Sequence, residues 1–313
     1  GFSVTTGSLN TLIGGAAGDA ITTGERNVAV GYNALTTNTL GSRTVAIGQG
    51  ALADQNYTTA TDSYNTAVGD SAGLQVTTGV QNTLVGGLAG DALTDADYNV
   101  AIGHGTLSTD TLGSYSTAVG TYALANQNFT TATNSYNTGV GYEAGSQITT
   151  GVGNTLLGGL AGDALTDADF NTAVGRGSLT SDTLGSRSTA IGYSALFSQN
   201  FTTATDAYNT AVGFESGANV TTGNSNTFIG GLTGDAITSG SNNVAVGKGA
   251  YSTDTQGREN VAVGNGALFT QNFTTSTTSF NTAVGSSAGG AITTGIQNTL
   301  IGGLVGDALT DAD

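Results

Sequence analysis

Short alternating runs recur along the whole chain, and each ends at a glycine. The residue before that glycine is always aliphatic, the residue two places earlier is always Thr or Val, and the residue between them is usually Ala. Residues 27–31, which read Asn-Val-Ala-Val-Gly, show the pattern. Alternation with a period of two and β-branched residues on one face predicts a short β-strand, and the glycine marks a turn.

The glycines recur at two fixed spacings that organise the chain. Three steps of 17 residues and one of 21 repeat as a 72-residue group. Because the array begins and ends inside a group, we expect it to be a window of a longer chain. We predict one repeat array over residues 1–313 with seventeen coils, divided into partial group 1–64, full groups 65–136, 137–208 and 209–280, and partial group 281–313.

A repeat of 17 residues is too short for a helix pair or a propeller blade, but it suits one coil of a β-solenoid. The predicted fold class is therefore all-β, a parallel β-solenoid (β-roll) whose equivalent residues stack about 4.8 Å apart. The first motif residue is Asn in fourteen of the seventeen coils. We expect these amides to form a structural ladder from coil to coil, which includes Asn10, Asn27, Asn65, Asn82, Asn99, Asn137, Asn154 and Asn171.

The motif resembles a known repeat. Residues 27–34 and 44–51 resemble the Asn-Ser-Val-Ala-Ile-Gly-x-x-Ser head repeat of trimeric autotransporter adhesins of the Yersinia adhesin type, and similar repeats of phage tail-fibre proteins. The resemblance covers the whole chain. It implies a left-handed β-roll, three chains side by side, and a role in adhesion or in a fibre. The longer coils and the four-coil super-period depart from the family's pattern.

Composition narrows the possible partners. The chain has 51 Gly and no Pro, Cys, Met or Trp, and only 9% of its residues are charged, so its core must be thin and regular. Its net charge is -16 and Lys248 is its only lysine. Nucleic acid and anionic membranes need clustered Lys and Arg, so we expect neither as a partner. No apolar run reaches the roughly 18 residues of a membrane helix, and no membrane insertion is expected.

Catalytic chemistry is not expected either. A Ser-His-Asp or Cys-His arrangement needs a base, and the only histidine, His104, is replaced by Arg176 and Lys248 one and two groups later. We interpret His104 as a polar residue on a solvated turn. We predict that the chain is not an enzyme.

One segment resembles a calcium-binding repeat. Residues 86–93, Gly-Gly-Leu-Ala-Gly-Asp-Ala-Leu, resemble the nonapeptide of toxin-type β-rolls, in which consecutive turns share calcium ligands. Here the segment returns only every 72 residues, so a solvated acidic turn is the favoured interpretation. We expect no cofactor, with calcium as the alternative. The candidate ligands are carboxylates, namely Asp91, Asp95, Asp97, Asp163, Asp167 and Asp169.

The 21-residue coils carry insertions within residues 55–64, 127–136, 199–208 and 271–280. Stacked strands keep their length, so we expect protruding loops on one side of the solenoid. Each loop holds an Asn-x-Thr glycan acceptor and two aromatic residues that could close it as a clasp. These loop residues are Asn56, Tyr57, Tyr64, Asn128, Phe129, Tyr136, Asn200, Phe201, Tyr208, Asn272, Phe273 and Phe280.

Two orientations of the strand remain open. With the β-branched residues inside, the middle residue forms an outer apolar row that a neighbouring chain can cover. That row is small in three coils and large in the fourth, at Leu12, Leu84, Leu156, Phe228 and Leu300. The opposite orientation makes this row the core and exposes the Thr. We favour Thr inside, which argues against an ice-binding Thr face.

We therefore expect a structural rod segment of an extracellular fibre or adhesin, on a cell surface or a virion. It would associate with copies of itself as a trimer or filament and present repeated lateral surfaces, with a cell-surface glycan or receptor as a further partner. The alternative is a lattice-binding module for ice or polysaccharide.

Overall fold

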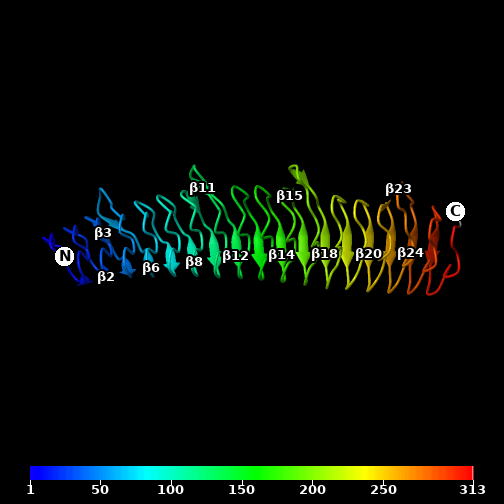
Figure 1. The fold of residues 1–313 in the computed structure, drawn as a ribbon, viewed down its shortest axis with the longest axis horizontal. Helices are drawn as coiled ribbons and strands as arrows, with labels where there is room; N and C mark the ends of the chain where they lie inside the picture. Colours follow the sequence, from blue (N-terminus) through cyan, green and yellow to red (C-terminus); the bar gives the residue numbers. More distant parts are fainter. Residues whose placement is uncertain (312) are drawn as a thin grey trace. The chain divides into compact units, whose positions relative to one another are not determined.

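The chain is a parallel β-solenoid, as its repeat predicts. The structure is a computed structural model that describes residues 1–311 and 313, and within these residues it contains strands and turns but no helix. Accordingly, no described segment forms a helix that could cross a membrane. The chain divides into two compact units, Gly1–Asn154 and Thr155–Asp313, and each is a stack of coils (Figure 1).

In the first unit each coil contributes one three-residue strand to a parallel sheet. Equivalent residues face each other, so that Thr11 pairs with Val28 and Leu12 with Ala29. The backbone of each coil is therefore hydrogen-bonded by its neighbours. These strands are β1 (Thr11–Ile13), β2 (Val28–Val30), β4 (Val45–Ile47), β6 (Thr66–Val68), β7 (Thr83–Val85), β8 (Val100–Ile102), β10 (Thr117–Val119) and β12 (Thr138–Val140).

The second unit repeats this arrangement. Thr155 pairs with Thr172, and Phe228 pairs with Ala245, again in parallel and in register. Its strands are β13 (Thr155–Leu157), β14 (Thr172–Val174), β16 (Thr189–Ile191), β18 (Thr210–Val212), β19 (Thr227–Ile229), β20 (Val244–Val246), β22 (Val261–Val263), β24 (Thr282–Val284) and β25 (Thr299–Ile301).

Where a 21-residue coil follows a 17-residue coil, a second, two-residue strand forms in each. The pairs in the first unit are β3 (Gly41–Ser42) with β5 (Thr61–Asp62), and β9 (Gly113–Ser114) with β11 (Thr133–Asn134). Those in the second unit are β15 (Gly185–Ser186) with β17 (Thr205–Asp206), and β21 (Gly257–Arg258) with β23 (Thr277–Thr278).

The orientation that we favoured for the main strands is wrong. The middle residue of each strand faces the core, and Ala29, Leu84 and Phe228 are all fully buried. The flanking Thr and Val residues are half-buried or exposed. Large residues from the turns, such as Leu35 and Leu107, already occupy the core, so each strand contributes only its middle residue to it. The middle row is thus the core and not a lateral interface.

The large middle residues have a packing explanation. Glycine stands four positions after the motif glycine in two successive coils of each group, as at Gly73 and Gly90, and the large middle residue Leu84 packs against both. A Cβ on Gly73 would lie 2.6 Å from Leu84 Cδ1, and one on Gly90 would lie 2.8 Å from its Cδ2. The other two coils of a group combine a middle Ala with a large buried residue at that position, such as Leu107 or Leu124. Leu84 therefore fills the space that glycine leaves in its own coil and in the coil before it.

The motif glycines are required by the close stacking of coils. Gly48 has a φ of 135°, and a Cβ there would lie 2.2 Å from the carbonyl oxygen of Gly69 in the next coil. Only glycine permits this approach. Other corners use single left-handed residues with side chains, for example Tyr98 with a φ of 59°.

Candidate functional surface

The main strands present a continuous outward surface in each unit, which we call the outer strand face. It consists of the first and third residues of every three-residue strand, with the middle residue pointing inward. Most of these side chains are half-buried, and some, such as Ile47 and Ile102, are 37% and 39% exposed. Because the strands pair in register, equivalent side chains repeat about every 4.8 Å along a unit.

This face carries no charge. Its first position is always Thr or Val, and its third is always Val, Ile or Leu, whereas the chain as a whole has a net charge of -16. The face is therefore β-branched and apolar with interspersed hydroxyls. An uncharged apolar surface of this regularity is typical of a contact surface.

Stacked aromatic and cationic side chains lie two residues before the strands. In the first unit Tyr98, Tyr115 and Tyr136 form a ladder with ring centroids 4.8 and 5.4 Å apart. In the second unit the Arg187 guanidinium lies 5.2 Å from the Phe170 ring centroid. These side chains cover one another's faces, so they link successive coils at the border of the outer strand face.

The predicted Asn ladder lies directly behind that border. Each amide bridges to the next coil: Asn82 Oδ1 accepts from Asn99 N at 2.9 Å, and Asn82 Nδ2 donates to Ala96 O at 2.7 Å. Asn27 makes the same two contacts. The main partners are therefore backbone groups of the next coil, and direct amide-to-amide contacts are secondary, as at Asn154 and Asn137, 3.3 Å apart. Asn10, Asn65, Asn99 and Asn171 likewise donate to the following coil.

Behind the two-residue strands lies a buried polar cluster that the sequence analysis missed. Asp110 is fully buried, and its Oδ1 accepts from Gly113 N and Phe129 N at 3.1 and 3.0 Å. Its Oδ2 accepts from Gln127 Nε2 at 2.5 Å. Asp182 and Asp254 are buried in the same way beside Gln199 and Gln271. The signal available in the sequence was the Asp-x-x-Gly turn that precedes three of the four 21-residue coils.

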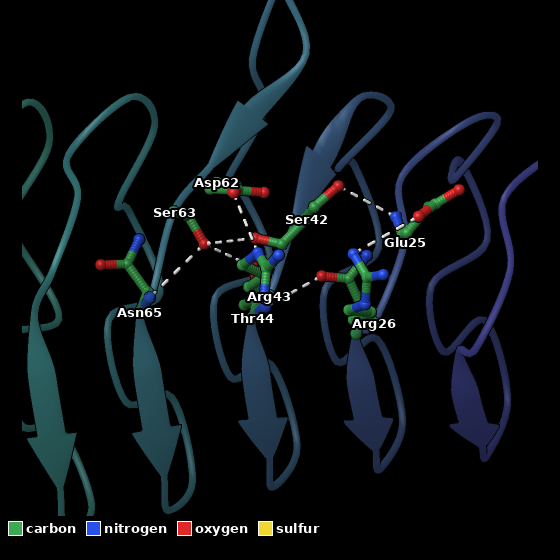
Figure 2. Close-up of polar contacts among 9 residues, drawn as sticks. Glu25, Arg26, Ser42, Arg43, Thr44, Asp62, Ser63 and Asn65 are labelled. Carbon is green, nitrogen blue, oxygen red and sulfur yellow. Dashed lines mark hydrogen bonds and ion pairs between the residues drawn. The ribbon is translucent and has the colours of Figure 1, made fainter.

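The first group has Asn38 in place of this aspartate. Figure 2 shows the hydroxyl pair and the surface ion pair at the same corner of the first group. Thr44 Oγ1 and Ser63 Oγ are 2.6 Å apart, and Ser63 Oγ also accepts from Asn65 N at 3.4 Å. On the surface Arg43 Nε donates to Asp62 Oδ2 at 2.9 Å. This ion pair is exposed, so it contributes little to stability.

The loops of the 21-residue coils do not form aromatic clasps. The first aromatic residue of each loop enters the coil, with Tyr57, Phe129, Phe201 and Phe273 only 4 to 7% exposed. The second aromatic residue is on the surface, with Tyr64, Tyr136, Tyr208 and Phe280 52 to 59% exposed. The two aromatic residues of a loop therefore lie in different environments, one buried and one exposed.

The loop tips are exposed at residues 58–60 and 130–132 in the first unit, and at residues 202–204 and 274–276 in the second. Figure 1 shows the segments at β3 and β11 on one side of the first unit, and those at β15 and β23 on one side of the second. Among the Asn-x-Thr acceptors, Asn56 and Asn200 are exposed, and Asn128 and Asn272 are half-buried.

The acidic turns do not gather into a metal site. Asp95 Oδ1 accepts from Thr78 Oγ1 at 2.5 Å, and Asp97 Oδ1 accepts from Val80 N at 2.7 Å. Burial raises the pKa of Asp91 and of Asp97. Among the described residues, no three His, Cys, Asp or Glu side chains lie close enough together to hold a metal ion.

The second copy of the acidic turn, at residues 163–169, and His104 also lie at the surface or in contacts with neighbouring coils. Asp163 accepts from Thr180 Oγ1, Asp167 is exposed, and Asp169 N donates to Ser186 Oγ at 2.9 Å. His104 is exposed, with its ring edge-on to Tyr122 at 5.4 Å.

The chain was compared with protein-family models, with curated proteins and with solved structures, and none of the three comparisons finds a match. The fold and its surfaces are therefore the basis of the functional argument.

Proposed function

We propose that this chain is a structural segment of an extracellular fibre or adhesin, on a cell surface or virion, whose identical copies associate laterally through the outer strand face. The observation that carries the proposal is the absence of any charged residue from this face in a chain with a net charge of -16. Charge elsewhere keeps the chain soluble, while an uncharged sheet face allows close contact. The role is mechanical and not catalytic.

Identical copies suit one another because the face has the same spacing in each. Side chains that repeat about every 4.8 Å on one chain interdigitate with the same repeat on another. The resemblance to trimeric adhesin repeats favours three chains over an open filament. This interface replaces the one expected from the middle row, which is buried.

Light scattering on the purified chain tests the proposal. We expect a stable oligomer at micromolar concentration, and its mass gives the number of copies. The double variant Val68→Lys and Val119→Lys places two charges on the face, and the flexible Lys stems can reach solvent without unfolding the coils. We expect this variant to be monomeric.

The matched control is Gln75→Lys and Gln147→Lys, which adds the same charge at exposed positions off the face. It should keep the wild-type mass. A monomeric wild-type chain, or equal masses for the two double variants, would falsify lateral association through this face.

A second candidate function follows from the outward Thr residues. Their hydroxyls lie on the outer strand face and not inside, which removes our argument against lattice binding. Thr at the first position of β6 and β7, for example, presents hydroxyls about one coil rise apart. Thermal hysteresis from a monomeric wild-type chain, lost in the Val68→Lys and Val119→Lys variant, would favour an ice-binding face over lateral association.

A further inference from the structure

A groove of about 830 Å³ lies on the second unit, away from the outer strand face. It runs over the turns that follow the motif glycines of five successive coils. Its walls combine apolar, hydroxyl, amide and charged side chains. The residues that matter for the argument are Asp235, Lys248, Asn265, Gly266, Phe269 and Ser287.

The groove exists because side chains are small here. The equivalent turns two groups earlier, in the first unit, enclose only about 250 Å³. The repeat assigns each lining position an equivalent 144 residues earlier: Gly266 corresponds to Tyr122, Ser287 to Glu143, and Ala291 to Gln147. Phe269 corresponds to Ala125, so the wider groove also gains an aromatic ring.

The groove contains polar groups that lack partners within the protein. Asp235 is half-buried, and its Oδ1 is a buried acceptor with no hydrogen-bond partner. That atom is covered by the protein, and the rest of the half-buried carboxylate lines the groove, where it can accept from a ligand hydroxyl. Lys248 is exposed and has no carboxylate oxygen within 4.0 Å among the described residues.

The apolar component is the Phe269 ring, which is 48% exposed beside the small residues Gly266 and Ala291. A ring in a pocket with a few converging polar groups is the usual composition of a small-ligand site, and the volume lies in the usual range. The ring also has no counterpart at Ala125 in the smaller hollow.

We propose that this groove binds an uncharged oligosaccharide. A sugar ring offers an apolar C–H face for Phe269 and hydroxyl donors for the Asp235 carboxylate, and its hydroxyl oxygens accept from Lys248 and the Asn265 amide. Anionic chains are disfavoured because Asp235 and Asp307 line the groove against a single lysine. The proposal is independent of lateral association, because the groove does not involve the outer strand face.

The repeat supplies a blocking variant with a native precedent. Gly266 has a φ of 62°, close to the 57° of Tyr122, and a Cβ on Gly266 would meet only Ser287 Oγ, at 3.7 Å. Gly266→Tyr should therefore fold and fill the groove. Phe269→Ala removes the ring and introduces the residue that the first unit has at Ala125.

The matched control is Asn33→Tyr, at the same coil position with a φ of 57° but outside the groove. All variants are first compared with the wild type by circular dichroism and thermal unfolding. Binding is then screened on an array of uncharged, uronate-containing and sulfated oligosaccharides together with peptides, and the best uncharged probe is titrated calorimetrically.

We expect at least one uncharged oligosaccharide to bind, Gly266→Tyr and Phe269→Ala each to weaken it by about tenfold or more, and Asn33→Tyr to leave it unchanged. The proposal is overturned if no uncharged oligosaccharide binds, if only acidic chains or peptides bind, or if folded Gly266→Tyr binds as tightly as the wild type.

Discussion

At the scale of single residues, the three buried aspartates show how an acidic chain tolerates carboxylates in its core. Asp110 has no cationic partner in its cluster, and neutral donors satisfy it: two backbone N–H groups and one Gln amide. Hydrogen bonds to a charged acceptor are stronger than those to a neutral one. The first group places Asn38 at the equivalent position, where Asn38 Oδ1 accepts from Gly41 N at 3.0 Å.

This comparison predicts a graded response to substitution of Asp110. Asp110→Asn keeps an acceptor for the backbone, and Gln127 retains Ser116 Oγ at 2.7 Å, so we expect a loss of about 1 kcal/mol. Asp110→Ala leaves two buried N–H groups without partners and should cost at least about 2 kcal/mol. Urea unfolding measures both, and equal losses would contradict this account.

A second residue-scale prediction concerns pH. Burial raises the pKa of Asp91 above its ordinary value of 3.8, with His104 opposing the shift. A raised pKa means that the protonated form is favoured by folding. This contribution is complete below the unfolded pKa and is lost as the pH rises through the folded value.

Removing the carboxylate should flatten that part of the pH profile. We expect the free energy of unfolding of Asp91→Asn, relative to the wild type, to rise as the pH increases from about 4 to 7. The control is Asp70→Asn on an exposed turn. If the wild type and Asp91→Asn keep a constant difference in free energy of unfolding over this range, folding does not raise the pKa of Asp91.

At the scale of the coil, the sequence predicted the strands and the register but not which face is inside. Alternation with a period of two defines two faces of a strand, but it does not show which face packs into the core. The decisive signal was a volume exchange between positions: Leu84 occurs where two successive coils carry Gly73 and Gly90, whereas the other two coils of a group combine a middle Ala with a large residue such as Leu107. Two positions that exchange volume must share a core.

The candidate surfaces were predictable to a smaller extent. The sequence predicted the Asn ladder as a feature of stacked coils, because one residue type recurs at one position. It could not predict the groove, which arises where several small residues from different coils, such as Gly266 and Ser287, come together. Nor could it show that Tyr57 and Tyr64 separate into an inner and an outer ring.

That separation gives a prediction for the 21-residue coils. Phe273 is 7% exposed and Phe280 is 52% exposed, although both belong to one loop. Phe273→Ala should cost about 3–5 kcal/mol because it leaves a cavity at the end of the coil. Phe280→Ala should change stability by no more than about 0.5 kcal/mol. Denaturant unfolding of the two variants decides the point, and similar losses would show that the rings are not divided in this way.

At the scale of the whole molecule, each coil is held by the coils before and after it. Strand β7 pairs with β6 and β8, and the Asn ladder and the aromatic ladders also connect neighbouring coils. Stability is then approximately a sum over coils and their interfaces. The type of neighbour matters as well, because the four coils of a group differ in which core position carries the large residue.

This organisation predicts that removing a whole group is less damaging than removing half a coil. Deleting residues 65–136 joins Tyr64 to Asn137, the equivalent of Asn65, so every remaining coil keeps a neighbour of the original type. Deleting only residues 87–95 leaves Gly86 and Gly103 eight residues apart, which is too short to close a coil, so β7 and β8 cannot both remain in register.

Denaturant unfolding of the two deletion variants tests this. We expect the variant that lacks residues 65–136 to unfold cooperatively, and its free energy of unfolding should fall less steeply with denaturant concentration than that of the wild type, because unfolding exposes less surface. The nine-residue deletion should lose cooperativity, and a reversed order of the two would show that stability does not depend on complete coils.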